Sequence, residues 1–416
     1  MRLDTSAVLP EDSSSAQLIG RIWDPETRGP RPVLFSDGLL LDLFDTAGTV
    51  SALLNSDDLP ELLQQARNSD VRRWDLQDVL ASAEVPAGPA GSAGSAGSAS
   101  PAGETDGTEL RLLSPLDLQA VKACGVTFVD SMIERVIEER CAGDLRLAET
   151  MRARVMESIG GSLAGLKPGS DEAARVKEVF LREGFWSQYL EVGIGPDPEV
   201  FTKAPVLSTV GCGAGIGIPH FSTWNNPEPE LVLLVDSRGR IRGCTLGNDV
   251  NLRDVEGRSA LLLGMAKDNN GSAAVGPFIR LFDDAYTLED ARQETIRLTV
   301  HGSDGYTLSG TNSVQRLSRP FEELVGAAYG RHHQYPDGFA LYTGTLFAPS
   351  EDRDAPGMGF THKIGDTVQI SSSRLGTLTN TVERTEDLAP WTYGIGSLLD
   401  YLVQTRRTAA RAGTNG

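Results

Sequence analysis

Several residue types are scarce in this chain, and each scarcity excludes a class of protein. The 416 residues include only four cysteines, which are widely spaced and contain no Cys-x-x-Cys pair. This pattern excludes a disulfide framework or a zinc knuckle and is typical of reduced thiols in a cytoplasm. The five histidines form no His-x-x-x-His pair, so a zinc site built on histidines is not expected.

Positive charge and long apolar runs are scarce as well. The chain has 38 lysines and arginines against 57 aspartates and glutamates, which gives a formal net charge of -19. Nucleic acids and anionic membranes bind basic surfaces, so we expect neither as a partner. No apolar run approaches the length of a membrane span, and the N-terminus lacks the basic-then-apolar layout of a signal peptide. The expected location is therefore the cytoplasm.

The composition divides the chain into three segments. Residues 1–84 predict a small α+β domain, with three strands between 18 and 43 and a long helix at 60–83. Residues 85–109 are rich in alanine, glycine, serine and proline, which predicts a flexible linker because such residues cannot build a core. Residues 110–416 predict a larger, strand-rich catalytic domain with peripheral helices. The expected fold class is α+β.

Apolar spacing places the elements of the larger domain. Strands predominate between 188 and 370, with a clear hairpin at 295–310. Ser114 is expected to cap the first helix. Three- to four-residue spacing predicts helices at 116–123, 129–141, 145–159, 170–183, 259–267, 320–329 and 395–406.

A glycine-rich stretch at 211–219 is superficially similar to a nucleotide-binding loop. It has no closing Lys-Ser or Lys-Thr, and its glycines do not fit the dinucleotide pattern. We expect a mobile surface loop there or, as the functional alternative, a lid over a site.

Two glutamates stand at the mouth of a strongly apolar run. Glu228 and Glu230 alternate with Pro227 and Pro229, and prolines favour extended backbone in the residue before them. Residues i and i+2 of an extended chain point to the same side, so both carboxylates enter one space. A second apolar strand ends at Asp249, and a hairpin would return that residue to the glutamates.

Three converging carboxylates predict a site for a hard divalent cation, Mg2+ or Mn2+, because like charges repel unless a cation separates them. The alternative is that the glutamates are solvated charges on a sheet edge. The neighbouring apolar run is typical of a buried strand, and burying an unpaired carboxylate beside it would cost free energy. This favours the metal site.

Lys267 follows an apolar helix and has two interpretations. A lysine at a helix end usually offsets the helix dipole. Beside a carboxylate cluster it could instead bind a substrate anion, or transfer a proton with a lowered pKa. The chain has no Gly-x-Ser-x-Gly elbow, so hydrolysis by a serine nucleophile is not favoured.

An ordered set of motifs resembles the fumarylacetoacetate hydrolase superfamily from about residue 114 to the C-terminal helix. The motifs are Pro227–Leu231, Gly243–Asp254, Lys267-Asp268, Gly276-Pro277 and Tyr342–Thr345. The resemblance implies a mixed β-roll fold paired as a homodimer or a dimer of dimers. It also implies that Glu228, Glu230 and Asp249 bind Mg2+ or Mn2+.

Further motifs resemble a sugar-acid branch of that superfamily. They are Gly125-Val126-Thr127-Phe128, Trp186–Glu191, Pro198–Lys203, Trp224–Glu230 and His333–Gly338. The resemblance implies a Mg2+-dependent hydro-lyase of oxidative pentose degradation. Such an enzyme converts a xylose- or arabinose-derived 2-keto-3-deoxy-pentonate to 2-oxoglutarate semialdehyde. The implied catalytic residues are Glu199, Lys267 and Thr245, and the implied substrate-binding residues are Lys203, Thr345 and Ser131.

Two alternatives to dehydration stay open at this point. One is a C–C bond hydrolase or decarboxylase that acts on acylpyruvates with the same metal site. Hydrolytic members of the superfamily carry a catalytic histidine where Ser131 stands here, whereas the glutamate three residues later is kept as Glu134. The missing histidine argues against hydrolysis. The other alternative is a carbohydrate-binding module without enzymatic activity.

Overall fold

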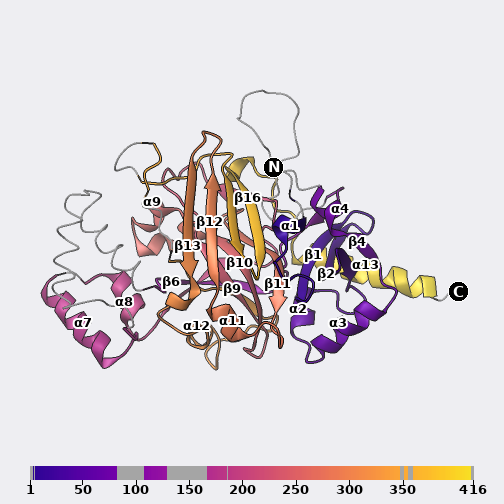
Figure 1. Ribbon diagram of the computed structural model, residues 1–416, viewed down its shortest axis with the longest axis horizontal. Coiled ribbons are helices and arrows are strands. Elements are labelled where there is room, and N and C mark those ends of the chain that lie inside the picture. The colour runs from indigo at the N-terminus through magenta and orange to yellow at the C-terminus, as the bar shows by residue number, and fades with distance from the viewer. Residues whose placement is uncertain are drawn as a thin grey trace.

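Two β-sheets form the centre of the molecule, and helices lie around them (Figure 1). The computed structural model describes residues 3, 5–81, 107–128, 166–184, 186–346, 351–354 and 359–413. The sheets share one hydrophobic cluster, so their facing surfaces bury each other. Both sheets are mixed, because each contains a parallel pair of strands. The expected α+β class is confirmed, and neither strand order closes into a barrel.

The larger sheet has 11 strands in the order β4-β3-β2-β1-β11-β10-β9-β14-β6-β7, with β5 paired to β1. Its strands are β1 (Leu18–Asp24), β2 (Gly29–Ser36), β3 (Leu39–Asp42), β4 (Arg73–Asp75), β5 (Arg111–Leu112), β6 (Ala120–Gly125), β7 (Glu199–Ala204), β9 (Pro229–Val235), β10 (Ile241–Asp249), β11 (Ala273–Leu281) and β14 (Phe339–Tyr342). The smaller sheet has the order β13-β12-β15-β16-β8. Its strands are β8 (Gly215–Ile218), β12 (Thr295–His301), β13 (Thr307–Ser313), β15 (Thr367–Ser372) and β16 (Gly376–Arg384).

The described helices lie at the periphery (Figure 1). They are α1 (Thr5–Val8), α2 (Val50–Leu54), α3 (Leu59–Asn68), α4 (Leu76–Ala81), α7 (Asp171–Arg182), α8 (Gln188–Ile194), α9 (Arg253–Glu256), α10 (Leu263–Lys267), α11 (Leu288–Arg292), α12 (Phe321–Ala328) and α13 (Ile395–Gly413). Short 3-10 turns occur at Ala260–Leu262, Val314–Arg316 and Thr385–Asp387. Among the described residues, no helix has both the length and the apolar character needed to cross a lipid bilayer.

Strand β9 is apolar along its length because both of its faces are covered. Leu231 and Leu233 pack into the cluster between the two sheets, whereas Val232 and Leu234 pack into a second cluster on the other face. Such a strand reads as a continuous apolar run instead of an alternating one. Its burial fixes the position of the glutamates at its N-terminal end.

The N-terminal strands extend the same sheet instead of forming a sheet of their own. Strand β1 pairs with β11, and Ile19 lies opposite Ile279. The predicted linker at 85–109 falls mainly on residues outside the described part of the chain, so the domain boundary stays a prediction. The helices expected at 129–141 and 145–159 also lie outside the described residues.

Several expected elements are confirmed. Strands β12 and β13 form the expected hairpin, with Thr295 opposite Ser313. Helix α7 begins after Ser170, whose side chain accepts a hydrogen bond from the backbone of Ala173. Helices α10, α12 and α13 lie where the spacing predicted them.

Other assignments from the sequence were wrong. The segment 116–123 contains the start of strand β6, which pairs with β14 and β7, and Ser114 accepts a hydrogen bond from the hydroxyl of Thr209 instead of capping a helix. The long helix expected at 60–83 is interrupted by β4, and Gln188 begins helix α8, not a strand. Short apolar runs fit both periodicities, and the sheet pairing decides between them.

The glycine-rich stretch at 211–219 is neither a mobile loop nor a lid. Its second half is β8, which pairs in parallel with β16 and is buried throughout. The amide of Gly213 donates to the carbonyl of Thr379, and the side chain of Asn380 donates to the carbonyl of Gly211. The glycines permit close packing of backbone against backbone.

Replacing Gly211 by alanine should destabilise the protein. A Cβ atom at this position would lie 2.5 Å from the carbonyl carbon of Leu113 and 2.6 Å from the amide nitrogen of Ser114, and backbone atoms cannot turn away. We expect a loss of about 1–3 kcal/mol in the free energy of unfolding, measured by urea denaturation. The control is Gly326→Ala in α12, where a Cβ meets nothing within 4 Å. Equal stability of both variants would contradict this packing.

Candidate active site

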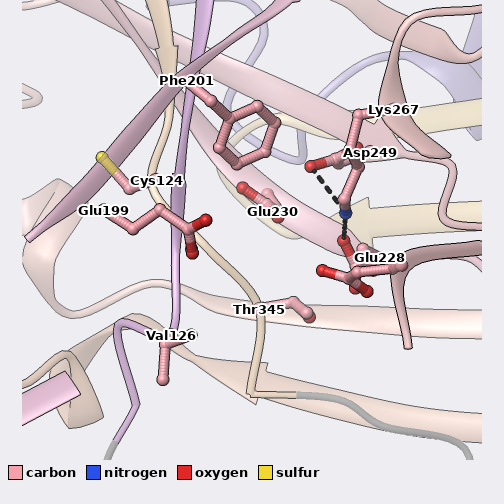
Figure 2. A pocket seen from close by; sticks show the side chains of 11 residues that line it. Cys124, Val126, Glu199, Phe201, Glu228, Glu230, Asp249, Lys267 and Thr345 are labelled. Atoms are coloured by element: carbon pink, nitrogen blue, oxygen red, sulfur yellow. Dashed lines mark hydrogen bonds and ion pairs between the residues drawn. The ribbon is translucent and has the colours of Figure 1, made fainter. Parts of the chain in front are cut away.

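A small cavity lies where β6, β7, β9 and β10 approach helices α9 and α10 (Figure 2). Its lining is strongly acidic, and no histidine among the described residues takes part in it. The lining residues are Cys124, Gly125, Val126, Glu199, Phe201, Glu228, Glu230, Asp249, Glu256, Lys267 and Thr345. A site of this composition suits a small polar molecule and a cation.

The β9–β10 hairpin brings three carboxylates together, as the sequence predicted. Glu230 lies opposite Gly247, and the amide of Asp249 donates to the carbonyl of Glu228 at 3.0 Å. Each of the three acidic side chains offers an oxygen within 4.8 Å of the others. Their exposures are 4% for Glu228, 1% for Glu230 and 1% for Asp249, so solvent does little to screen their repulsion.

Lys267 offsets part of this negative charge. Its Nζ lies 2.5 Å from Glu228 Oε2 and 3.2 Å from Asp249 Oδ2, the two contacts dashed in Figure 2. Burial alone lowers the pKa of Lys267, but the charges of Asp249 and Glu228 outweigh it and hold this pKa above its ordinary value. A lowered pKa belonged to one of the two interpretations of Lys267 from the sequence, and the charges of this cluster act in the opposite direction.

Glu230 shows that the cluster carries more negative charge than these contacts offset. Burial, followed by the charges of Asp249 and Glu228, raises the pKa of Glu230 well above its ordinary value. Lys267 and the amide of Gly344, which donates to Glu230 Oε2 at 2.6 Å, oppose this only in part. Three hard oxygen donors with unrelieved repulsion fit a divalent ion such as Mg2+.

Neighbouring polar groups hold the glutamates in place. Asn251 Nδ2 donates to Glu228 Oε1 at 3.1 Å and to Glu256 Oε2 at 2.6 Å. The carboxylate of Asp254 accepts hydrogen bonds from Ser222 Oγ at 2.9 Å and from the amide of Thr223 at 2.7 Å. Asp254 is therefore a structural residue that fixes the loop leading to Glu228.

Glu199 enters the cavity from the other wall, across from Lys267 in Figure 2. It begins β7 directly opposite Gly125 of β6, and a Cβ at Gly125 would lie 2.0 Å from Glu199 Oε2. The glycine thus leaves the room that the carboxylate occupies. The next residue, Val126, has a φ of 52°, a rare conformation for a β-branched residue, and it also lines the cavity.

The cavity gathers most, but not all, of the residues expected at the site. Thr345 lines it, whereas Thr245 does not, because the hydroxyl of Thr245 is buried and donates to the carbonyl of Phe278 at 2.7 Å. Lys203 lies behind Asp249, fully buried, with its Nζ 2.8 Å from Asp249 Oδ1. Ser131 lies outside the described residues.

The sequence interpretation gave no site role to five residues of the lining: Cys124, Gly125, Val126, Phe201 and Glu256. Cys124 and Val126 flank Gly125 on a segment read partly as helix, so their position could not be foreseen. Phe201 follows Glu199 by two residues, and the period of a strand could have found it. Glu256 had no such signal, because it reaches the cavity through the turn of α9.

Comparison with known proteins finds a family model that matches the part of the chain carrying most of this site. Residues 190–383 match the family described as fumarylacetoacetate (FAA) hydrolase C-terminal. The chain contains a fumarylacetoacetate hydrolase family domain. The resemblance seen in the motifs is thereby confirmed, and the three carboxylates, Glu199 and Lys267 all lie within this domain.

Two relatives have names that describe sugar-acid dehydratases. A Haloferax volcanii protein, named probable 2-keto-3-deoxyxylonate dehydratase, is 29% identical over 266 residues, which cover 64% of this chain and 86% of the relative. A Saccharolobus solfataricus protein, named 2-dehydro-3-deoxy-D-arabinonate dehydratase, is 33% identical over 187 residues, which cover 45% of this chain and 59% of the relative.

Solved structures share the fold of this chain. An apo structure of 2-keto-3-deoxy-D-arabinonate dehydratase has a TM-score of 0.57 at 22% identity, over 88% of this chain and 99% of that one. A structure of 2-keto-3-deoxy-D-arabinonate dehydratase complexed with magnesium and 2,5-dioxopentanoate has a TM-score of 0.57 at 23% identity, with the same coverage.

Glu230→Gln should stabilise the metal-free protein, and more so as the pH rises. The pKa of Glu230 is higher in the folded protein than in the unfolded chain. At pH values between these two pKa values, the folded protein therefore binds a proton that the unfolded chain does not bind. Its stability therefore falls as the pH rises through that window, and the amide removes this loss. The melting temperature in EDTA, measured from pH 5 to 8, tests this. The control is Glu178→Gln on the exposed face of α7. Parallel profiles for wild type and Glu230→Gln would contradict the charge crowding.

Proposed function

We propose that this protein is a metal-dependent hydro-lyase that removes water from a 2-keto-3-deoxy-pentonate and forms 2,5-dioxopentanoate, which is 2-oxoglutarate semialdehyde. The observation that carries the proposal is the buried cluster of Glu228, Glu230 and Asp249, in one cavity with Glu199 and Lys267. The names of both relatives, and the magnesium and 2,5-dioxopentanoate bound to a protein of the same fold, support this substrate class.

The three carboxylates would hold Mg2+. When bound, Mg2+ supplies Lewis acidity toward the ketone of a 2-keto acid and a positive charge for its carboxylate. Glu228 and Asp249 are already paired with Lys267 and Asn251, so the protein orients them before any ligand binds. Thr345 lines the same cavity and is placed to hydrogen-bond a substrate oxygen.

Dehydration requires two proton transfers, and the cavity offers two groups for them. One proton leaves the methylene beside the ketone, and the hydroxyl on the next carbon departs with another proton as water. Lys267 and Glu199 face the cavity from different elements, which suits them to act on these two neighbouring carbons. This elimination leaves a double bond between carbons 3 and 4 and an intact hydroxymethyl group at carbon 5. Transfer of one C–H proton and the hydroxyl proton of carbon 5 to carbons 3 and 4, through enol forms, then gives the aldehyde. The overall balance of the reaction is the loss of one water.

Hydrolysis of acylpyruvates has less support from this cavity. A hydrolase needs a base that activates water, and no histidine among the described residues lines the site. The use of Mn2+ in place of Mg2+, a homodimer or dimer of dimers, a cytoplasmic location, and the roles of Thr245 and Ser131 stay predictions.

Incubation of the purified protein with each epimer of 2-keto-3-deoxy-pentonate tests the proposed reaction. With Mg2+ we expect semialdehyde, detected by proton NMR, from at least one epimer. EDTA should abolish the reaction, and added Mg2+ should restore it, because the proposed reaction needs a divalent cation bound by the three carboxylates. Cleavage of an acylpyruvate without dehydration of either sugar acid would overturn the proposal.

Glu199→Gln should lower kcat by about 10²–10⁴-fold, because an amide cannot transfer the proton. Exchange of the methylene hydrogens with deuterated water assigns its role. Loss of exchange identifies Glu199 as the base, and retained exchange without water loss identifies it as the acid. The control is Glu191→Gln, whose half-exposed carboxylate pairs with Lys177 on the surface. Full turnover by Glu199→Gln would remove Glu199 from the mechanism.

A further inference from the structure

Lys203 is a buried cation that the reaction scheme does not use. Its side chain is 0% exposed at the end of β7, and it does not line the cavity. Its Nζ lies 2.8 Å from Asp249 Oδ1 and donates hydrogen bonds to the carbonyls of Val250 and Lys267. Two of the three N–H donors of the ammonium group therefore go to backbone carbonyls, and its charge is paired with Asp249. Because Lys203 is fully buried and does not line the cavity, a substrate in the cavity does not contact it.

The contacts of Lys203 join three separate parts of the site. Asp249 is the last residue of strand β10 and Val250 follows it, whereas Lys267 is the last residue of helix α10. One side chain from β7 therefore fixes the position of a carboxylate of the cluster and the backbone of the lysine on its other side. The two oxygens of Asp249 are divided between the lysines, with Oδ1 on Lys203 and Oδ2 on Lys267.

Asp249 is a buried carboxylate that lies between two cations, Lys203 and Lys267. Without Lys203 it would keep only one cationic partner, and burying a carboxylate is costly unless partners compensate its charge.

We propose that Lys203 is a positioning residue that holds the carboxylate of Asp249 in orientation for a divalent cation, and not a substrate-binding residue. This role rests on the proposed metal site, but it is measured without substrate. Residues behind a metal ligand fix its orientation, and their loss typically weakens metal binding by about 10–100-fold.

The test is the affinity of the metal-free protein for Mg2+, measured by isothermal titration calorimetry. For Lys203→Met, which keeps the length of the side chain and removes its charge, we expect Mg2+ binding to be about 10–100-fold weaker. The matched control is Lys122→Met on the adjacent strand β6, where Nζ donates only to Thr202 Oγ1 at 2.9 Å. Its Mg2+ affinity should equal that of the wild type. Unchanged or tighter binding by Lys203→Met overturns the proposal.

A second measurement separates the positioning role from a loss of packing. The double variant Lys203→Met/Asp249→Asn removes both charges, so it should recover stability to urea that Lys203→Met loses. This recovery is expected even if Lys203→Met alone fails to fold. A double variant at least as unstable as Lys203→Met would show that Lys203 acts only through packing, which overturns the proposal. Because neither measurement uses turnover, failure of the dehydration assay with intact Mg2+ binding would count against the proposed function alone.

Discussion

The mutual repulsion of three buried carboxylates is the constraint on which this structure depends. Glu228, Glu230 and Asp249 share one small space from which solvent is nearly excluded. Moving a charge out of water costs several kcal/mol, of the order expected for buried ions, unless partners compensate it. The compensation comes from distant parts of the chain, as Lys203 belongs to β7 and Lys267 to α10. The fold brings these elements together at the carboxylate cluster.

The surrounding sheet keeps the carboxylates from moving apart. Strand β9 is buried on both faces, so its first residues cannot swing without disturbing two hydrophobic clusters. The loop before Glu228 is fixed by Asp254, and Asn251 bridges Glu228 to Glu256. Such rigid surroundings hold the carboxylates close together although they repel each other. Binding of a cation would relieve that repulsion, so the arrangement favours a hard ion. The opposite wall holds Glu199 apart from this cluster, so a small molecule in the cavity would lie between Glu199 and the three carboxylates.

The errors of sequence interpretation share a physical cause. The apolar residues of 116–123 fit a helix and a strand about equally, and only the presence of β14 and β7 on either side selects the strand. The glycines at 211–219 indicate flexibility when considered alone. In the fold they permit close contact with the backbone at Leu113 and with β16. Local sequence cannot show whether a neighbouring strand is available to accept hydrogen bonds, and that availability decides both cases.

The sequence by itself determined the hairpin and its acidic end. Alternation in extended backbone puts Glu228 and Glu230 on one side, and the length of the following strand returns Asp249 to them. These relations are local, since they depend on backbone geometry over about twenty residues. Only the tertiary structure decided what faces the cluster: Glu199 beside Gly125 in the cavity, Lys203 behind Asp249, and Thr245 turned away. Those positions depend on how strands far apart in the chain pair and pack, because burial and charge compensation are set by neighbours that no local pattern specifies.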